Sequence, residues 1–306
     1  CEIKLSPFNL KECEDYFKNE NIEMSRYDIV QSYMVFGGIP YYLSYFKKGM
    51  SFEGNADNIL FGKNPRLKDE FNRLFNAIFS NPEDCKKIIR MLAKKHVGFT
   101  REEIAKETGL PFGGGLTDTL NALVESDFIQ RYRPYNVSGK VSFYKLIDNF
   151  SLFWLKYVEP NTEDINFMTD NMTSNIMRVW RGVAFEEVCW QHIGQIKRAL
   201  GISGVSSSIS AWSVKGNDNK EGVQIDLLII RNDNVVNLCE MKFAGDIYSI
   251  DKEEDAKIRN RIQTLINTLS PKQSVHLTMI TTYGVSHTMY GGRVQQQVIL
   301  DDLFQS

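Results

Sequence analysis

The chain has 306 residues, of which 42% are hydrophobic and 24% are charged, and its formal net charge is −2. This length exceeds one typical domain, so we expect at least two domains, each with its own hydrophobic core. The small net charge excludes a chain that is basic over its whole surface, and any nucleic-acid-binding surface must therefore be local. Because no apolar stretch is long enough for a transmembrane helix and no signal peptide is evident, we expect a cytoplasmic protein without a membrane partner.

Five cysteines, Cys1, Cys13, Cys85, Cys189 and Cys239, are spread along the chain without a CxxC pair. Their odd number and wide spacing predict reduced thiols rather than a zinc site or a disulfide framework. The chain begins with cysteine instead of methionine, which predicts either a fragment of a longer protein or a processed N-terminus.

Residues 1–81 have the pattern of a helical region. In "SRYDIVQSYMVF" the apolar residues recur at helical spacing after Ser25, which is a typical N-cap residue. The sequence "GGIP" at 37–40 then interrupts the helical pattern, which resumes in "YYLSYF".

Residues 82–147 have the pattern of a winged helix-turn-helix. A first helix, "EDCKKIIRMLAKKH", is followed by "TREEIAKETG", in which Thr100 and Glu103 have capping-box spacing. A third helix covers about 116–126, and two strand-like segments joined by the turn "VSGK" come next.

This segment is also the basic part of the chain, with eleven Lys and Arg against six Asp and Glu between Cys85 and Ile147. Its third helix, in the position of a recognition helix, contains acidic residues and no Lys or Arg, which disfavours phosphate contacts. The candidates for contact with the DNA backbone are therefore the wing residues Arg131, Arg133 and Lys140. The alternative is a winged helix that only separates or joins proteins.

Residues 148–306 alternate between helices and strands. The aromatic-rich "DNFSLFWLKYVEP" and a long amphipathic helix come first, and three strands, a polar helix at about 252–269 and a further strand follow. This order predicts an α/β domain with a mixed central sheet, and the whole chain is expected to be a multidomain α+β protein. The charges at the start of the polar helix have mixed signs, so a solvated face is expected there.

The stretch "VQIDLLIIRNDNVVNLCEMKF" predicts an apolar β-hairpin that contains three charged residues, Asp226, Glu240 and Lys242. Alternation along the strands places Asp226 on the face of Leu228, with Ile225 on the opposite face, and it places Glu240 and Lys242 together. Charged residues are seldom buried unless they are paired or bind a metal, so these three need a partner.

A three-residue loop at 232–234 would bring Asp226 directly opposite Glu240, about 5 Å away, whereas a two-residue loop would shift this register. Two like charges so close are destabilising, and a hard divalent cation such as Mg²⁺ or Mn²⁺ would relieve the repulsion. Lys242 would then orient a water molecule or stabilise charge on a phosphoryl group. The alternative is a salt-bridged cluster at a sheet edge, in which Lys242 neutralises the carboxylates.

This arrangement resembles the PD-(D/E)XK nuclease core: an acid, a gap, and then Glu240-Met241-Lys242 on a hairpin, preceded by a helix that contains "FEE". The resemblance implies a restriction-endonuclease-like fold for 148–306. It also implies that Asp226, Glu240 and the helical acid Glu186 bind the metal and that all three act in catalysis with Lys242. Glu187 is the competing choice for the helical acid.

The order of segments, including "YMVFGGIPYYLSYF" and "DNFSLFWLKYV", resembles the C-terminal part of a prokaryotic AAA+ ATPase of archaeal type. The resemblance implies a helical lid at 1–81, a winged helix at 82–147, a nuclease-like domain at 148–306, and a P-loop ATPase domain before Cys1. No G-x-x-x-x-G-K-[ST] motif occurs in this chain, so we expect no ATP hydrolysis from it alone.

Three functions follow as hypotheses. The first is a metal-dependent DNA phosphodiesterase, with DNA as partner and Mg²⁺ or Mn²⁺ as cofactor. The second is a catalytically inactive DNA-binding or regulatory module of an ATPase. The third is an adaptor that contacts only proteins.

Overall fold

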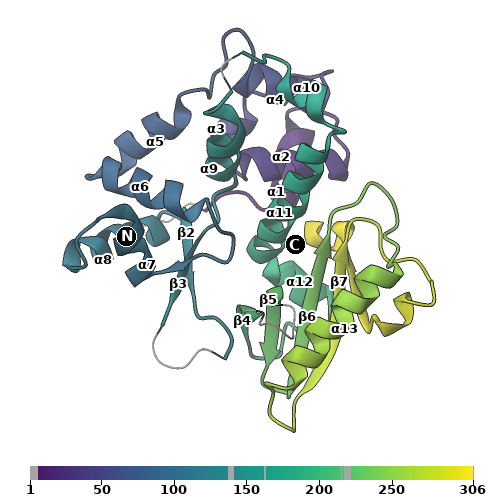
Figure 1. Cartoon of the computed structure of the whole chain (residues 1–306). Helices are drawn as coiled ribbons and strands as arrows, with labels where there is room; N and C mark the ends of the chain where they lie inside the picture. Colours follow the sequence, from purple (N-terminus) through teal and green to yellow (C-terminus); the bar gives the residue numbers. More distant parts are fainter. Residues whose placement is uncertain (1–5, 137–140, 162, 215, 217–221, 306) are drawn as a thin grey trace. The chain divides into compact units, whose positions relative to one another are not determined.

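The structure is a computed structural model that describes residues 6–136, 141–161, 163–214, 216 and 222–305 (Figure 1). The chain divides into two compact units. The first contains Cys1–Arg131 and Ser142–Glu187, and the second contains Tyr132–Val141 and Val188–Ser306. Helices and a mixed five-stranded sheet are both present, which confirms the expected mixture of α and β structure.

The first unit is largely helical. Apart from residues 82–146, which are described below, its elements are α1 (Leu10–Asn19), α2 (Arg26–Phe36), α3 (Pro40–Leu43), α4 (Phe52–Leu60), α5 (Glu70–Ile78), α9 (Asn149–Phe153), a π-helical turn η1 (Trp154–Val158), α10 (Phe167–Asn171) and most of α11 (Asn175–Gln191). The predicted N-cap of α2 is confirmed, because the Ser25 hydroxyl accepts a hydrogen bond from the Asp28 amide. The break at "GGIP" is also confirmed: α2 ends at Phe36, and Pro40 begins α3.

Residues 148–187 pack in the first unit, which differs from the domain boundary expected at 147. The Asn149 side chain donates to the Tyr33 carbonyl at 3.1 Å, and the Trp154 indole donates to the Lys68 carbonyl at 2.7 Å. The Trp154 ring also stacks on Phe71 with 4.7 Å between centroids. The aromatic residues after 148 therefore complete the core of the helical region instead of opening a new domain. The boundary expected at 81 does not divide the units either.

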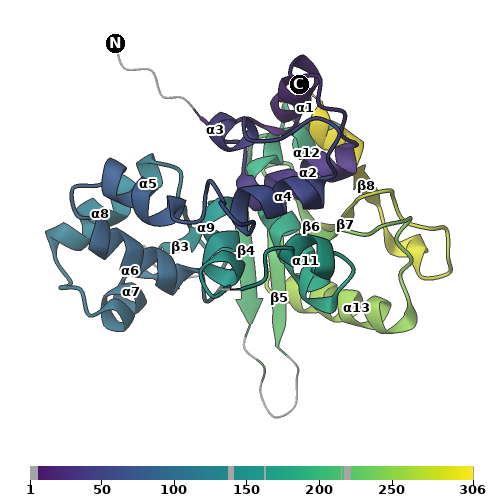
Figure 2. The same cartoon turned by 90° about the horizontal axis from the view of Figure 1, so that it is seen from above.

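A small three-stranded sheet accompanies three helices of the first unit, which lie close together in Figures 1 and 2. These elements are α6 (Pro82–Leu92), β1 (Phe99–Thr100), α7 (Arg101–Thr108), α8 (Gly114–Glu125), β2 (Ile129–Tyr132) and β3 (Phe143–Leu146), and the strand order is β1-β3-β2. The predicted capping box at the start of α7 is confirmed. The Thr100 hydroxyl accepts a hydrogen bond from the Glu103 amide, and the Glu103 carboxylate accepts one from the Thr100 amide. Gly109, with a φ of 72°, ends α7 in the left-handed conformation.

The second unit is built on a mixed sheet in the order β4-β5-β6-β7-β8. Its elements are α12 (Ile193–Ala199), β4 (Ser207–Val214), β5 (Val223–Arg231), β6 (Val235–Lys242), α13 (Lys252–Ile266), β7 (Ser274–Thr281), a 3-10 turn η2 (Gly291–Arg293), β8 (Gln296–Ile299) and a 3-10 turn η3 (Leu300–Phe304). The first three strands are antiparallel, whereas β6, β7 and β8 are parallel. Helix α13 connects β6 to β7 and lies over one face of the sheet, and α12 lies on the other side of the sheet (Figure 1).

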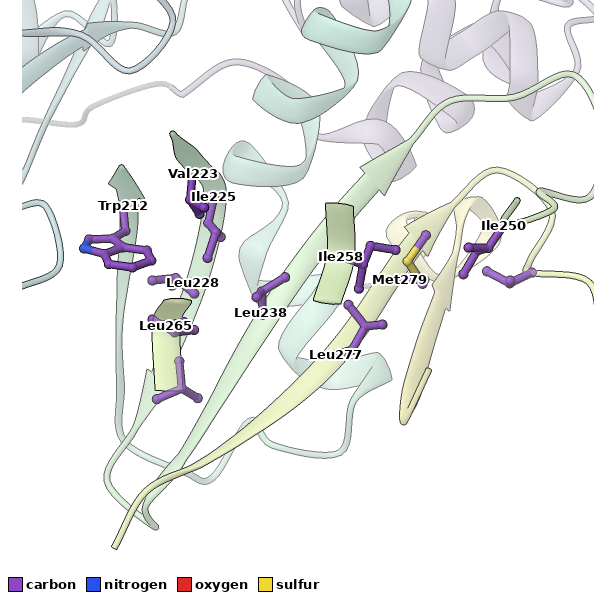
Figure 3. Close-up of a cluster of buried hydrophobic side chains, with 12 residues drawn as sticks. Trp212, Val223, Ile225, Leu228, Leu238, Ile250, Ile258, Leu265, Leu277 and Met279 are labelled. Carbon is purple, nitrogen blue, oxygen red and sulfur yellow. The ribbon is translucent and has the colours of Figure 1, made fainter. Parts of the chain in front are cut away.

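Apolar side chains fill the space between α13 and the sheet (Figure 3). Ile258 and Leu265 of α13 belong to one buried cluster with Leu228, Leu238 and Leu277 of the central strands. This packing fixes α13 against β5, β6 and β7. It therefore also fixes where the charged side chains of α13 lie.

In the part of the chain that the structure describes, no helix combines the length and the apolar character that a bilayer crossing requires.

Candidate functional site

The hairpin formed by β5 and β6 has the register predicted for a three-residue loop. Residues 232–234 connect the strands, and Asn234 adopts a left-handed φ of 67°, as is common at the end of such loops. The strands pair Leu228 with Leu238 and Leu227 with Cys239. The next position in this register sets Asp226 opposite Glu240.

A β-bulge lies at the position of Asp226. Strand β4 pairs Ser210 with Leu228 but Trp212 with Ile225, so β5 has one more residue than β4 between these pairs. Bulges bend a strand and redirect its side chains, and they are frequent next to active sites.

The bulge changes which residues share a face of the sheet. Ile225 and Val223 belong to the same buried cluster as Leu228, on the side of α13. The expectation that Ile225 lies on the face opposite Leu228 was wrong, because the additional residue at Asp226 interrupts the alternation.

Asp226 is half-buried and held at two points. Its carbonyl accepts a hydrogen bond from the Trp190 indole at 2.8 Å. Its carboxylate accepts one from the Gln224 side chain at 2.6 Å. The bulge therefore presents a carboxylate whose backbone is anchored by a buried indole.

Glu240 is buried, with 7% of its surface exposed. The Arg261 Nη1 lies 3.1 Å from its Oε1 and 3.2 Å from its Oε2, and the Arg261 Nε donates to the Gln224 carbonyl at 3.1 Å. Burial raises the pKa of Glu240 to about 7, although the charges of Arg261 and Lys242 oppose this rise. The nearby charge of Asp226 adds to it.

Lys242 ends strand β6, and its Nζ lies 2.8 Å from the Glu254 Oε1. Burial by itself would lower the pKa of this ammonium, but the hydrogen bond to Glu254 and the charge of Glu240 outweigh burial, so the pKa is raised. Lys242 is therefore held in its charged form.

Two residues of α13 thus complete the site, and we call Glu240, Lys242, Glu254 and Arg261 the charge cluster. Sequence reasoning gave no role to Glu254 or Arg261. A signal was present, because Glu254, Ile258, Arg261 and Leu265 are spaced by four, three and four residues and therefore share one helix face. The two apolar members of this stripe are buried against the sheet, and the two charged members point to the same side.

The predicted helical acid belongs to a different unit. Glu186 lies on α11 in the first unit, whereas Asp226, Glu240 and Lys242 all belong to the second. The competing choice, Glu187, forms a buried ion pair with Lys145 at 2.7 Å. This pairing makes Glu187 a structural residue of the first unit.

Two carboxylates across a hairpin are suitable oxygen donors for Mg²⁺ or Mn²⁺. No group of three or more His, Cys, Asp or Glu side chains in the described ranges is arranged to hold a metal. Arg261 contacts both oxygens of Glu240, so a cation at this carboxylate would have to displace the guanidinium. The donor atoms therefore fit a hard cation only after Arg261 moves.

The candidates for DNA contact lie around the β2–β3 connection. Arg131 and Arg133 are exposed. The Arg131 guanidinium donates to the Ser142 hydroxyl at 3.2 Å, and the Arg133 carbonyl accepts from the Ser210 hydroxyl at 2.9 Å. Lys140 lies outside the described residues. Both described arginines thus keep a charged group at the surface.

A groove of about 840 Å³ runs between β5 and α13. Its lining combines amide and hydroxyl side chains, such as Gln224, Asn260 and Thr264, with the acid Glu253 and with apolar surface. Its two basic residues are Lys257, which pairs with Glu253 at 2.7 Å, and Arg261 of the charge cluster.

Comparison with known proteins shows that the chain is similar to an archaeal protein. It is 27% identical over 237 residues to the uncharacterized protein MJECL04 of Methanocaldococcus jannaschii, and the match covers 76% of this chain and 50% of the relative. The chain thus spans about half the length of the relative it matches. No known family model matches the sequence.

Proposed function

We propose that the second unit hydrolyses DNA phosphodiester bonds with the help of a divalent cation, in the manner of PD-(D/E)XK nucleases. The observation that carries the proposal is the hairpin register, which pairs Leu227 with Cys239 and, continued by one residue, would set Asp226 opposite Glu240, with Lys242 two residues further along the same strand. Loop length and strand pairing fix this register as far as Leu227 and Cys239, so Asp226 and Glu240 follow directly after a paired position.

In this proposal Asp226 and Glu240 hold Mg²⁺ or Mn²⁺. The cation would polarise a phosphoryl oxygen and lower the pKa of a bound water. Lys242 is kept protonated by Glu254, so it suits stabilisation of negative charge on the phosphoryl group better than abstraction of a proton.

We further propose that α6, α7, α8 and the small sheet form a winged helix, because three helices and three strands follow the order of that fold. Arg131 and Arg133, with Lys140, are its proposed contacts to the DNA backbone. The relative is about twice as long as the matched region, which supports a longer parent protein. We propose an ATPase domain as its missing part.

A second candidate function is a DNA-binding or protein-binding module without catalysis. One observation favours it: Arg261 neutralises Glu240 and Glu254 neutralises Lys242, so the charge cluster is balanced without a metal. A nuclease fold that survives as a scaffold would show this arrangement.

Nicking of supercoiled plasmid DNA in the presence of Mn²⁺ tests the first candidate. We expect the wild type to nick the plasmid and Asp226→Asn to lose this activity. The matched control is Asp233→Asn, because Asp233 is an exposed carboxylate in the turn of the same hairpin and pairs with Arg231.

Nicking that persists in Asp226→Asn would refute the assignment of the site. Absence of nicking in the wild type, together with salt-sensitive DNA binding, would favour the second candidate.

A further inference from the structure

Arg261 takes part in two features of the second unit at once. Its Nη1 contacts both carboxylate oxygens of Glu240, and its side chain lines the groove between β5 and α13. One cation therefore lies between the proposed metal site and a groove that is open to ligands.

A metal ion and the Arg261 guanidinium compete for the same oxygens. Both are cations, and both would contact the carboxylate of Glu240 within ordinary ion-pair or coordination distance. A cation at Glu240 with Arg261 still in place would be repelled at short range, because the guanidinium lies 3.1 and 3.2 Å from the two carboxylate oxygens. Loading of the metal therefore requires a different partner for Arg261.

The groove can receive an anion that supplies this partner. Guanidinium groups bind phosphate oxygens through two parallel hydrogen bonds, and the neighbouring amide and hydroxyl side chains, such as Asn260 and Thr264, add further polar contacts. The other basic residue of the groove, Lys257, is paired with Glu253 on its own helix. Arg261 is thus the groove cation whose present partner belongs to the proposed metal site.

We propose that Arg261 is an exchangeable latch: a phosphodiester bound in the groove draws Arg261 away from Glu240 and so opens Glu240 to the divalent cation. The inference rests on the proposed function, since it concerns the same carboxylate pair. Its consequence is positive linkage between DNA and metal, in which each ligand strengthens the binding of the other by the same factor.

Calorimetric titration of Mn²⁺ tests the linkage, with and without a short single-stranded oligothymidylate that is recovered intact afterwards. Heats from titration into the oligonucleotide alone are subtracted. In the wild type we expect the oligonucleotide to lower the Mn²⁺ dissociation constant by about tenfold. In Arg261→Gln we expect the affinity for Mn²⁺ to be about tenfold higher without the oligonucleotide, and unchanged when it is added.

The matched control is Arg259→Gln, which removes a guanidinium from the same helix, because Arg259 pairs with Asp255, does not line the groove and leaves the pair of Arg261 with Glu240 intact. It should behave like the wild type. If Arg261→Gln does not fold, Arg261→Lys takes its place, and it should bind Mn²⁺ more tightly than the wild type without the oligonucleotide, because an ammonium lacks the second anchor that the guanidinium has on the Gln224 carbonyl.

Equal Mn²⁺ affinity in the wild type and Arg261→Gln, with no effect of the oligonucleotide, would overturn the latch and leave the metal site standing. Lack of Mn²⁺ binding in all three proteins, with and without the oligonucleotide, would overturn both the latch and the proposed function.

Discussion

Arg261 and Glu240 join α13 to β6 through a partly buried ion pair, in which the side chains are 25% and 9% exposed. The same arginine donates to the Gln224 carbonyl of β5, so one side chain connects a helix to two strands. This relationship defines the candidate site in the absence of a metal.

The pair should show strong coupling in a double-mutant cycle. Arg261→Gln leaves a buried carboxylate without its cation, and we expect a loss of about 2–4 kcal/mol in the free energy of unfolding. Adding Glu240→Gln should recover part of this loss, because the buried charge is then removed. Urea denaturation of the four proteins measures the coupling, and strictly additive effects would contradict it.

Lys145 and Glu187 form the corresponding pair in the first unit, at 2.7 Å and with side chains 6% and 2% exposed. We expect Lys145→Met to destabilise the protein by about 3–5 kcal/mol, because Glu187 stays in a buried position and loses the cation of its ion pair. The double variant Lys145→Met with Glu187→Leu should be clearly more stable than the single variant. Thermal and urea unfolding curves compare them, and equal stability of both variants would argue against a buried charge.

His192 should make the protein sensitive to mild acid. Burial lowers the pKa of His192 to about 4 from its usual 6.5, and its Nδ1 bonds to the Val188 carbonyl at 2.8 Å. The folded state thus binds the proton more weakly than the unfolded state. The neutral imidazole therefore contributes fully to stability above pH 6.5, and this contribution is lost as the pH falls toward 4. The total loss in the free energy of unfolding is about 3 kcal/mol.

His192→Asn keeps a donor near the position of Nδ1 but does not titrate, so it is the matched variant. Urea midpoints at several pH values between 7 and 4 should fall more steeply for the wild type than for His192→Asn. Parallel pH profiles would show that His192 is not responsible.

Gly38 of the "GGIP" sequence allows two backbone segments to approach closely. A Cβ at this position would lie 1.8 Å from the Phe8 carbonyl oxygen, and the Phe8 amide donates to the Gly38 carbonyl at 2.7 Å. We expect Gly38→Ala to cost about 2–3 kcal/mol, since the backbone must shift.

Gly115 of α8 provides the comparison, because a Cβ there would meet no atom within 4 Å. Gly115→Ala should stabilise the protein by about 0.5–1 kcal/mol by lowering the entropy of the unfolded chain. Unfolding midpoints that move in the same direction for both variants would contradict this interpretation.

Much of the local structure follows from the sequence, because short-range rules apply. The loop at 232–234 has the length that sets Asp226 opposite Glu240, and the strands pair in that register. Thr100 and Glu103 form the capping box that their spacing predicts. These features depend on residues a few positions apart, and neighbouring residues in a chain cannot separate.

The face of Ile225 and the limits of the units did not follow from the sequence. The bulge that places Ile225 beside Leu228 exists only because β4 pairs with β5 out of step. The aromatic residues after 148 were expected to begin the last domain, but Trp154 is buried against Phe71 of the helical region. Both outcomes depend on partners that are distant in the chain.

The sequence by itself therefore limited the hairpin to two registers, one for a three-residue loop and one for a two-residue loop, and the observed strand pairing is that of the three-residue loop. It also determined that Glu254 and Arg261 share a helix face with Ile258 and Leu265. Only the tertiary structure decided that this face packs on β6, so that Arg261 pairs with Glu240 and Glu254 with Lys242. The physical reason is that burial of the apolar stripe against the sheet positions α13, and the charged partners meet as a consequence of that packing.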